Sequence, residues 1–175
     1  MPPSKLIALP LVGLLSLALS ALSACDGASL EDSDESDAGS SCGPSSGVVG
    51  RVIDGDTIEL EGGEKIRYLM IDTPESTTEQ ECWGTEAKDA NTAFVDGMEV
   101  QLAYDVECTD NFGRLLAYVS VNGTNINELM VERGHACVLH IPPNGDEVLD
   151  LYESLEDAAR ASNKGLWGAC EPPPC

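Results

Sequence analysis

The stretch from Glu64 to Ser76, EKIRYLMIDTPES, constrains the fold more than any other part of the chain. Its apolar residues can cover both faces of a strand, which indicates a buried position. Arg67 interrupts this apolar run, and Asp72-Thr73-Pro74-Glu75 ends it with two carboxylates and a proline. Positions 67 and 72 are five apart, so simple alternation sends their side chains to opposite faces. The strand must therefore bend or end before Asp72.

Turn residues divide the segment around this stretch into short strands. Asp54-Gly55 and Gly62-Gly63 are turn signals between alternating apolar residues, and they predict three antiparallel strands near 47–53, 56–61 and 65–71. Two further strands are expected within 99–106 and 114–121. Short strands joined by tight turns favour a small barrel.

Helical spacing appears later in the chain. A helix is expected after Gly84 with Thr85 as its cap, a second over 125–134, and a third within 145–165. An extended piece is expected over 135–140. In the third helix the inner face is predicted from helical spacing as Val148, Leu151, Leu155 and Ala158. The fold class is therefore α+β.

The first residues indicate export. Lys5 precedes the uncharged apolar stretch 6–22, and Leu22-Ser23-Ala24-Cys25 ends it with small residues, which resembles the bacterial lipobox. We expect a signal peptide over 1–24 and lipid on Cys25, anchoring the chain to the bacterial cell envelope or outer surface. A transmembrane anchor is the alternative. The predicted division continues with an acidic Ser/Gly-rich tether (25–46), one domain (47–170) and a Pro-rich tail (171–175).

Charge limits the choice of partners. The predicted domain holds eight Lys and Arg against twenty-four Asp and Glu, a net charge near −16. Such a domain repels polyanions unless cations or salt intervene. Seven cysteines in an exported chain indicate disulfides, and without Cys25 the remaining six allow fifteen pairings. No C-x-x-C spacing occurs, which argues against structural zinc.

Carboxylates gather where the strands turn. Asp54 and Asp56 flank Gly55, and hairpin pairing can bring Asp56 close to Asp72. Hard oxygen donors at close range suit Ca²⁺, although an isolated Asp-Gly-Asp is more often only a turn. An EF-hand is excluded, because Glu59 stands where its loop requires glycine. Arg67 interrupts an apolar strand, and Arg114 opens the strand that follows the DNFG loop. A lone strand arginine usually forms a salt bridge, whereas two beside an acidic metal site indicate phosphate binding.

Several co-linear motifs identify a family. VIDGDTIEL, IRYLMIDTPE, GTEA, TDNFGRLLAYV, NINELMVERG and KGLW occur in order over about 48–168 and resemble the staphylococcal nuclease, or thermonuclease, family. The resemblance implies a five-stranded OB-type barrel with three helices. It also implies calcium-dependent hydrolysis of DNA and RNA, with single strands preferred and 3′-phosphate products.

The resemblance assigns a role to each matched residue. The resemblance implies that Asp56, Asp72 and the main-chain carbonyl of Thr73 bind Ca²⁺. Asp54 is expected to hold these ligands in place without contacting the ion itself. By the same resemblance Glu75 is expected to be the general base. Arg67 and Arg114 are expected to bind the phosphate and stabilise the transition state.

Two positions depart from the family pattern. Phe112, in the loop before Arg114, stands where the best-known member has polar residues, and we expect it to contact substrate. His140 stands where the resemblance places a base-stacking tyrosine, and a histidine ring can still stack. We infer no protein partner.

The position of the cysteines relative to this fold suggests two bridges. Cys82 and Cys108 lie in loops near the expected active site and are predicted to pair. The resemblance brings Cys137 beside Cys170, which leaves Cys42 and Cys175 to pair with each other or with another chain.

Two other functions fit parts of the pattern. A non-catalytic OB-type module could bind nucleic acid or protein, and a structural lipoprotein could bind Ca²⁺ for stability alone. The complete Asp, Arg and Glu set favours the enzyme over both.

Overall fold

The computed structural model describes residues 42–77 and 80–175. The predicted signal peptide, the lipidation site Cys25 and most of the predicted tether lie outside these residues. In the described ranges no helix is long and apolar enough to cross a membrane. The last residues assigned to the tether are ordered into the domain, because Cys42 forms a disulfide and Ser46 begins the first strand.

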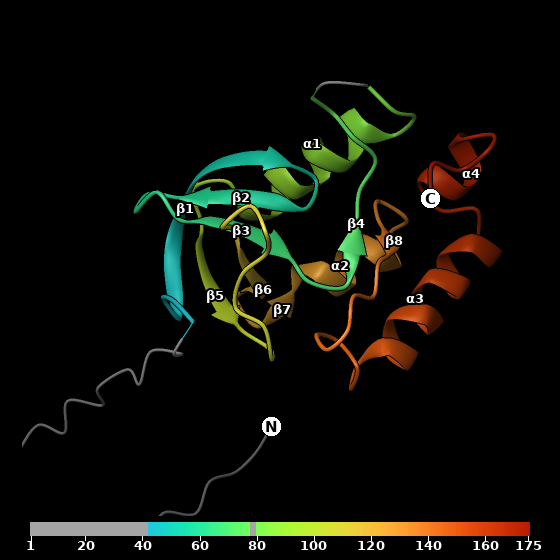
Figure 1. The fold of residues 1–175 in the computed structure, drawn as a ribbon. Helices are drawn as coiled ribbons and strands as arrows, with labels where there is room; N and C mark the ends of the chain where they lie inside the picture. The colour runs from blue at the N-terminus through green and yellow to red at the C-terminus, as the bar shows by residue number, and fades with distance from the viewer. Residues whose placement is uncertain (1–41, 78–79) are drawn as a thin grey trace, which may run out of the picture. The chain divides into compact units, whose positions relative to one another are not determined.

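A closed five-stranded barrel forms the centre of the domain, as the sequence predicts. Its strands follow the order β3-β2-β1-β5-β6, and a parallel pairing of β3 with β6 closes the ring (Figure 1). The other pairings in the ring are antiparallel. The strand bounds are β1 Ser46–Asp54, β2 Thr57–Leu60, β3 Lys65–Tyr68, β5 Glu99–Ala103 and β6 Leu115–Val121.

The third predicted strand is interrupted. β3 ends at Tyr68, and β4 (Ile71–Asp72) leaves the barrel to pair with β8 (Cys137–Val138) in a separate two-stranded sheet. Met70, at the break, has a φ of 67°, a conformation that non-glycine residues adopt rarely. The expectation that the strand ends before Asp72 is therefore confirmed. A short β7 (Thr124–Asn125) extends the sheet beyond β6.

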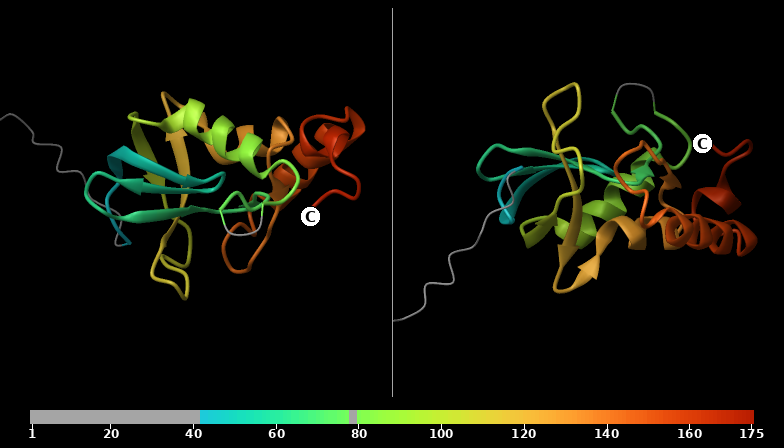
Figure 2. Two further views of the ribbon diagram at one scale, coloured as in Figure 1. Left: turned by 90° about the horizontal axis from the view of Figure 1, so that it is seen from above. Right: turned by 60° about the horizontal axis from the view of Figure 1, so that its bottom comes forward.

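Three helices and one additional helical turn complete the domain. They are α1 (Gly84–Val95), α2 (Ile126–Glu132), α3 (Leu149–Ala161) and the one-turn α4 (Leu166–Ala169). The barrel gathers at one end of the domain in Figures 1 and 2, with α3 and α4 at the other.

Two details of the helix prediction are wrong. The cap of α1 is Trp83 in a left-handed conformation, and the helix already includes Thr85. The predicted inner face of α3 is displaced, because Tyr152 and Ala159 are its buried residues and Leu151 is exposed. Val148 and Leu155 do pack against the core as predicted, and the two buried residues lie four positions after each of them, on the same face of the helix.

The apolar core fills the barrel and continues beneath α1 and α2. Ile58, Ile66, Val100 and Val119 are fully buried in it. Asn127 of α2 is one of the polar residues buried beside this core, and it is fully buried. Its side chain accepts a hydrogen bond from Val119 N at 2.9 Å and donates to the carbonyl oxygen of Leu69 at 2.9 Å. Asn127 therefore joins α2 to β6 and to the break that follows β3.

The predicted disulfide pairing is wrong. The bridges are Cys42–Cys108, Cys82–Cys170 and Cys137–Cys175. Antiparallel pairing of β1 with β5 brings the segment before β1 beside the loop after β5, where Tyr104 donates to the carbonyl of Pro44 at 2.8 Å.

The other two bridges follow from the position of α4. Leu166 N donates to the carbonyl of Gly134 at 2.9 Å and fixes α4 beside the residues that lead to β8. Cys170 and Cys137 pack in the same small cluster with Leu166, but they are not bonded to each other: Cys170 is bonded to Cys82, and Cys137 is bonded to Cys175.

We expect Asn127→Leu to lower the free energy of unfolding by about 2–4 kcal/mol. The leucine keeps a similar volume but leaves the Val119 N–H and the Leu69 carbonyl buried without this partner. Urea unfolding measures the change, with the exposed Asn111→Ala as control, for which we expect less than about 0.5 kcal/mol. Equal stability of Asn127→Leu and the natural chain would contradict the role of this side chain.

Candidate active site

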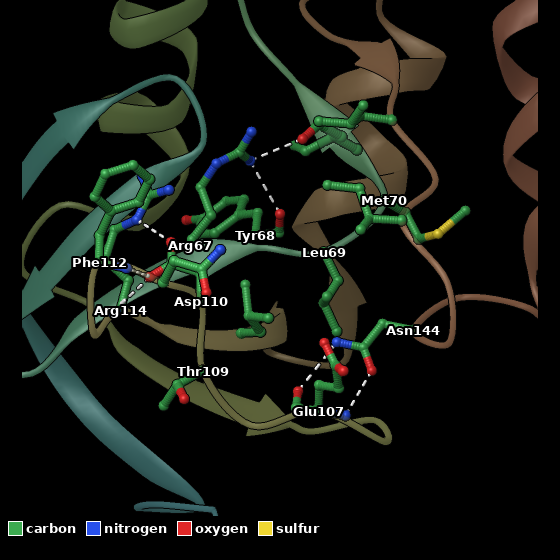
Figure 3. Close-up of a pocket in the computed structure, with 15 residues that line it drawn as sticks. Arg67, Tyr68, Leu69, Met70, Glu107, Thr109, Asp110, Phe112, Arg114 and Asn144 are labelled. Atoms are coloured by element: carbon green, nitrogen blue, oxygen red, sulfur yellow. Dashed lines mark hydrogen bonds and ion pairs between the residues drawn. The ribbon is translucent and has the colours of Figure 1, made fainter.

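Because the chain breaks after β3, the side chain of Arg67 meets the residues that follow it, up to Asp72. Its Nη1 donates to the carbonyl oxygens of Tyr68 at 3.0 Å and Ile71 at 2.7 Å, and its Nη2 donates to Asp72 Oδ1 at 2.7 Å. Figure 3 shows Arg67 rising from β3 with these backbone bonds. The left-handed conformation at Met70 thus resolves the five-residue spacing, because it lets positions 67 and 72 face each other.

Asp56 is fixed in the turn between β1 and β2. Its Oδ2 accepts hydrogen bonds from Thr73 N and Thr73 Oγ1, both at 2.9 Å, and it lies 3.3 Å from Arg67 Nη1. A Cβ on Gly55 would lie 2.7 Å from Thr73 Oγ1, so glycine is required for this close approach. Asp56 and Asp72 therefore share the same guanidinium.

Two further carboxylates lie beside this pair. Asp54 Oδ1 accepts from Gly55 N at 2.9 Å and from Ser76 Oγ at 2.8 Å, and its predicted support of the metal ligands stays a prediction. Burial raises the pKa of Glu75, and the charges of Asp54 and Asp56 raise it further. Burial also raises the pKa of Asp72, against the opposing effect of Arg67. Burial is the larger cause of both raised pKa values, and the neighbouring carboxylates add a repulsion that a bound cation would relieve.

Arg114 reaches the same place from the loop between β5 and β6. Its Nε donates to Asp110 Oδ2 at 2.6 Å, and its backbone N donates to Asp110 Oδ1 at 2.9 Å. Burial alone would raise the pKa of Asp110, but these hydrogen bonds and the arginine charge outweigh it and hold the pKa low. The Arg114 guanidinium also lies over the Phe112 ring, 5.6 Å from its centre.

One cavity of about 350 Å³ brings the predicted residues together. Sequence reasoning named six of its nine lining residues and gave no site role to Ile53, Thr57 and Lys65. Ile53 and Thr57 lie inside the VIDGDTIEL motif, whereas Lys65 lies outside every motif that carries the family resemblance. Thr57 Oγ1 donates to Asp56 Oδ1 at 2.9 Å. The cavity is lined by Ile53, Asp54, Asp56, Thr57, Lys65, Arg67, Asp72, Glu75 and Arg114.

A second cavity of about 330 Å³ shares Arg67 and Arg114 with the first (Figure 3). Phe112, 85% exposed, lines it, and its contact with substrate stays a prediction. Leu139 and Ile141 also line it, whereas His140 does not: its Nε2 pairs with Asp146 Oδ1 at 2.8 Å. Base stacking by His140 stays a prediction, and the apolar surface at this position comes from its two neighbours.

The donor set fits an oxygen-binding cation held at an open site. In residues 42–77 and 80–175 no group of three or more His, Cys, Asp or Glu is arranged to enclose a metal. Two carboxylates, Asp56 and Asp72, with the adjacent Thr73 carbonyl form a smaller set of hard oxygens. Divalent cations held by one or two carboxylates keep waters and substrate phosphate as their other ligands. Soft metals such as Cu(I) are disfavoured by this chemistry.

The sequence is similar to known nucleases. A sequence model described as "Staphylococcal nuclease homologue" matches residues 65–169. The chain is 33% identical over 126 residues to a thermonuclease of Staphylococcus intermedius, covering 69% of this chain and 74% of that protein. It is 36% identical over 137 residues to an uncharacterized endonuclease of Escherichia coli, covering 76% of this chain and 84% of that protein.

Other relatives are longer than the matched region. Identity to endonuclease YncB of Bacillus subtilis is 34% over 127 residues, covering 69% of this chain and 60% of that protein. The match covers 43% of the prophage-derived endonuclease YokF of the same organism. The chain thus spans less than two thirds of these two relatives.

We expect Arg67→Met to lower the free energy of unfolding by about 3–5 kcal/mol at pH 7, because it leaves the carboxylates of Asp56 and Asp72 without their shared cation. The loss should shrink as the pH falls. A carboxyl whose folded pKa is raised gains stability as the pH drops through that pKa, and removing Arg67 raises the Asp72 pKa further.

Urea unfolding at pH 7 and pH 4.5 measures both effects. Arg51→Met is the matched control, since the pair that Arg51 forms with Glu59 is exposed and should contribute less than about 1 kcal/mol. A loss that stays constant between the two pH values would contradict the assigned electrostatics.

Proposed function

The chain belongs to the staphylococcal nuclease family, and on this basis we propose that it is an exported, calcium-dependent phosphodiesterase that hydrolyses DNA and RNA to 3′-phosphate products. The observation that carries the proposal is the first cavity, which unites Arg67 and Arg114 with Asp56, Asp72 and Glu75. Two arginine forks beside hard oxygen donors suit a phosphodiester bound next to a divalent cation. Neither a purely structural Ca²⁺ site nor a core salt bridge requires this combination.

Asp56, Asp72 and the carbonyl of Thr73 are the residues that would hold Ca²⁺. When bound, the cation supplies Lewis-acid stabilisation of the phosphoryl oxygens. Thr73 has a second role in the chain itself, since its N–H and hydroxyl hold Asp56 in place. The hydrogen bonds from Thr57 and Thr73 use both Asp56 oxygens, which orients this carboxylate before any ligand arrives.

The arginines bind and stabilise the phosphate. In the described part of the chain the ion pair of Arg114 engages Nε, which leaves the two terminal nitrogens of its fork for phosphate oxygens. Arg67 already lies between the carboxylates and can turn a terminal nitrogen toward the same phosphate. A preorganised charge partner of this kind contributes about 10²–10³-fold to the rate.

Glu75 acts as the general base. It is exposed at the rim of the cavity, so water reaches its carboxylate, and its raised pKa makes it a stronger base than an ordinary glutamate. Glu75 takes a proton from water as the water oxygen attacks phosphorus. The bond from phosphorus to the 5′ oxygen breaks, this oxygen takes up a proton from solvent and leaves as an alcohol, and the phosphate stays on the 3′ oxygen.

The second cavity supports a preference for single strands. Phe112, Leu139 and Ile141 give it an apolar rim beside the two arginines. An unpaired base can enter such a cavity and stack, whereas a base within a duplex is held in the helix. The predicted contact of His140 with the base belongs to the same proposal.

Hydrolysis of single-stranded DNA tests the proposal. We expect cleavage by the residues 42–175 domain in Ca²⁺, its loss in chelator, and a drop of about 10²–10⁴-fold for Glu75→Gln. The control Glu59→Gln removes an equivalent charge from an exposed pair with Arg51 and should leave the rate unchanged. Binding without cleavage by the folded, oxidised protein would favour the non-catalytic module.

We also propose export and lipid attachment at Cys25, supported by the apolar stretch 6–22 and by three disulfides, which persist in oxidising compartments. Expressed in a bacterium, the full chain should partition with membranes, and Cys25→Ser should lose the added lipid mass. Mass spectrometry of the N-terminal peptide checks this. An unmodified Cys25 in an exported chain would contradict the anchor.

A further inference from the structure

The backbone of Glu75 is held by a second glutamate. Glu75 N donates to Glu81 Oε2 at 2.9 Å, and Glu81 N donates to the carbonyl oxygen of Glu75 at 3.0 Å. Gly84, the first residue of α1, donates to the Glu81 carbonyl at 3.1 Å. A Cβ on Gly84 would collide with the Glu75 carbonyl, so the start of the helix lies directly against this peptide unit. Both polar groups of the Glu75 backbone are thus engaged.

Glu81 is itself fixed by its neighbours in sequence. Cys82 forms a disulfide with Cys170, with the two Cα atoms 5.9 Å apart. Cys170 is 4% exposed and packs with Leu166 of α4. Trp83, the following residue, donates from Nε1 to His135 Nδ1 at 3.1 Å. The segment that carries Glu81 is therefore attached at two points, to the end of α4 and to the residues that precede β8.

We propose that Glu81, held in place by the Cys82–Cys170 disulfide, is a positioning residue that sets the location of the general base Glu75. The inference rests on the proposed function of Glu75 and extends it. Glu81 contacts the backbone of Glu75 and not the substrate, so it acts through the base. Glu75 and Glu81 are both exposed, and a hydrogen-bonded clamp between them supplies the fixed position that proton abstraction requires.

The charge of Glu81 has a separate effect that the test must exclude. Its carboxylate contributes to the raised pKa of Asp72. Glutamine removes this charge but keeps a carbonyl oxygen that can accept from Glu75 N. Alanine removes both. Comparison of the two variants therefore separates positioning from electrostatics.

We expect Glu81→Ala to lower kcat for single-stranded DNA by about 10- to 100-fold with KM within about twofold, because misplacing a reacting group by about 1 Å costs up to 10²-fold. Glu81→Gln should stay within about threefold of the natural chain. Glu86→Ala removes an exposed glutamate from the first turn of α1 and should leave kcat unchanged. A fall in Glu81→Gln equal to that in Glu81→Ala would overturn the proposal in favour of a charge effect.

The disulfide is tested in the same assay. The double variant Cys82→Ser with Cys170→Ser should lower kcat per folded molecule by about tenfold. Val100→Ala, a cavity in β5 remote from this segment, is the control for lost stability alone and should leave kcat per folded molecule unchanged. Full activity of the double variant would overturn the role of the bridge.

Amide hydrogen exchange gives a readout that does not depend on cleavage. Exchange of the Glu75 N–H, followed by NMR, should be slow in the natural chain and in Glu81→Gln, and faster by about tenfold or more in Glu81→Ala. Fast exchange in the natural chain would overturn the clamp. If the natural chain fails to cleave DNA yet shows this exchange pattern, the clamp stands and the proposed function of Glu75 fails.

Discussion

One guanidinium organises the entire site. Arg67 bonds two carbonyl oxygens at the break between β3 and β4 and bridges the carboxylates of Asp56 and Asp72. Without a cation at this point, the turn between β1 and β2 could not lie beside the end of β4, because the two acids would repel at short range. Without the carbonyl bonds, the uncommon backbone at Met70 would lose its local support. The positions of the two carboxylates and the backbone conformation at Met70 therefore both depend on the side chain of Arg67.

The distribution of charge reconciles an acidic domain with a phosphate ligand. Of the eight basic residues in a domain near −16, three line the first cavity: Lys65, Arg67 and Arg114. Four carboxylates line the same cavity, so the basic side chains alone do not make it positive, and a divalent cation bound there would shift the local charge in favour of a phosphate. A local field of this kind selects the bound phosphate without attracting the whole polymer, and salt weakens the long-range repulsion more than the short-range contacts.

Sequence reasoning located the site better than it located the connections around it. Arg67 and Asp72 stand out because they interrupt or end an apolar run, and the turn signals favour a small barrel. The roles predicted for Asp56, Arg67 and Asp72, and the five-stranded form of the barrel, came from the family resemblance. The only sequence signal for the break at Met70 was the five-residue separation of Arg67 and Asp72, which an unbroken strand would place on opposite faces. Glu81 carried no such signal, since an exposed glutamate in an acidic loop is indistinguishable from a solvated one until its partner is seen. The start of α3 was missed because residues 145–148 share the polarity and spacing of the helix that follows.

The disulfides could not be paired from the sequence, because pairing depends on which loops the barrel closure brings together. Each bridge nevertheless has one cysteine close to a residue of the site or to a residue that holds one. Cys108 lies two residues before Asp110, which holds Arg114; Cys82 adjoins Glu81; and Cys137 lies opposite Asp72 across the β4–β8 pair. The bridges join residues 66, 88 and 38 apart, long loops for which the loss of unfolded-state entropy is worth about 3–5 kcal/mol each in the chain-entropy model. The carboxylates of the site repel one another and so push apart the segments that these bridges join. The disulfides oppose this repulsion in segments that lie outside the barrel core.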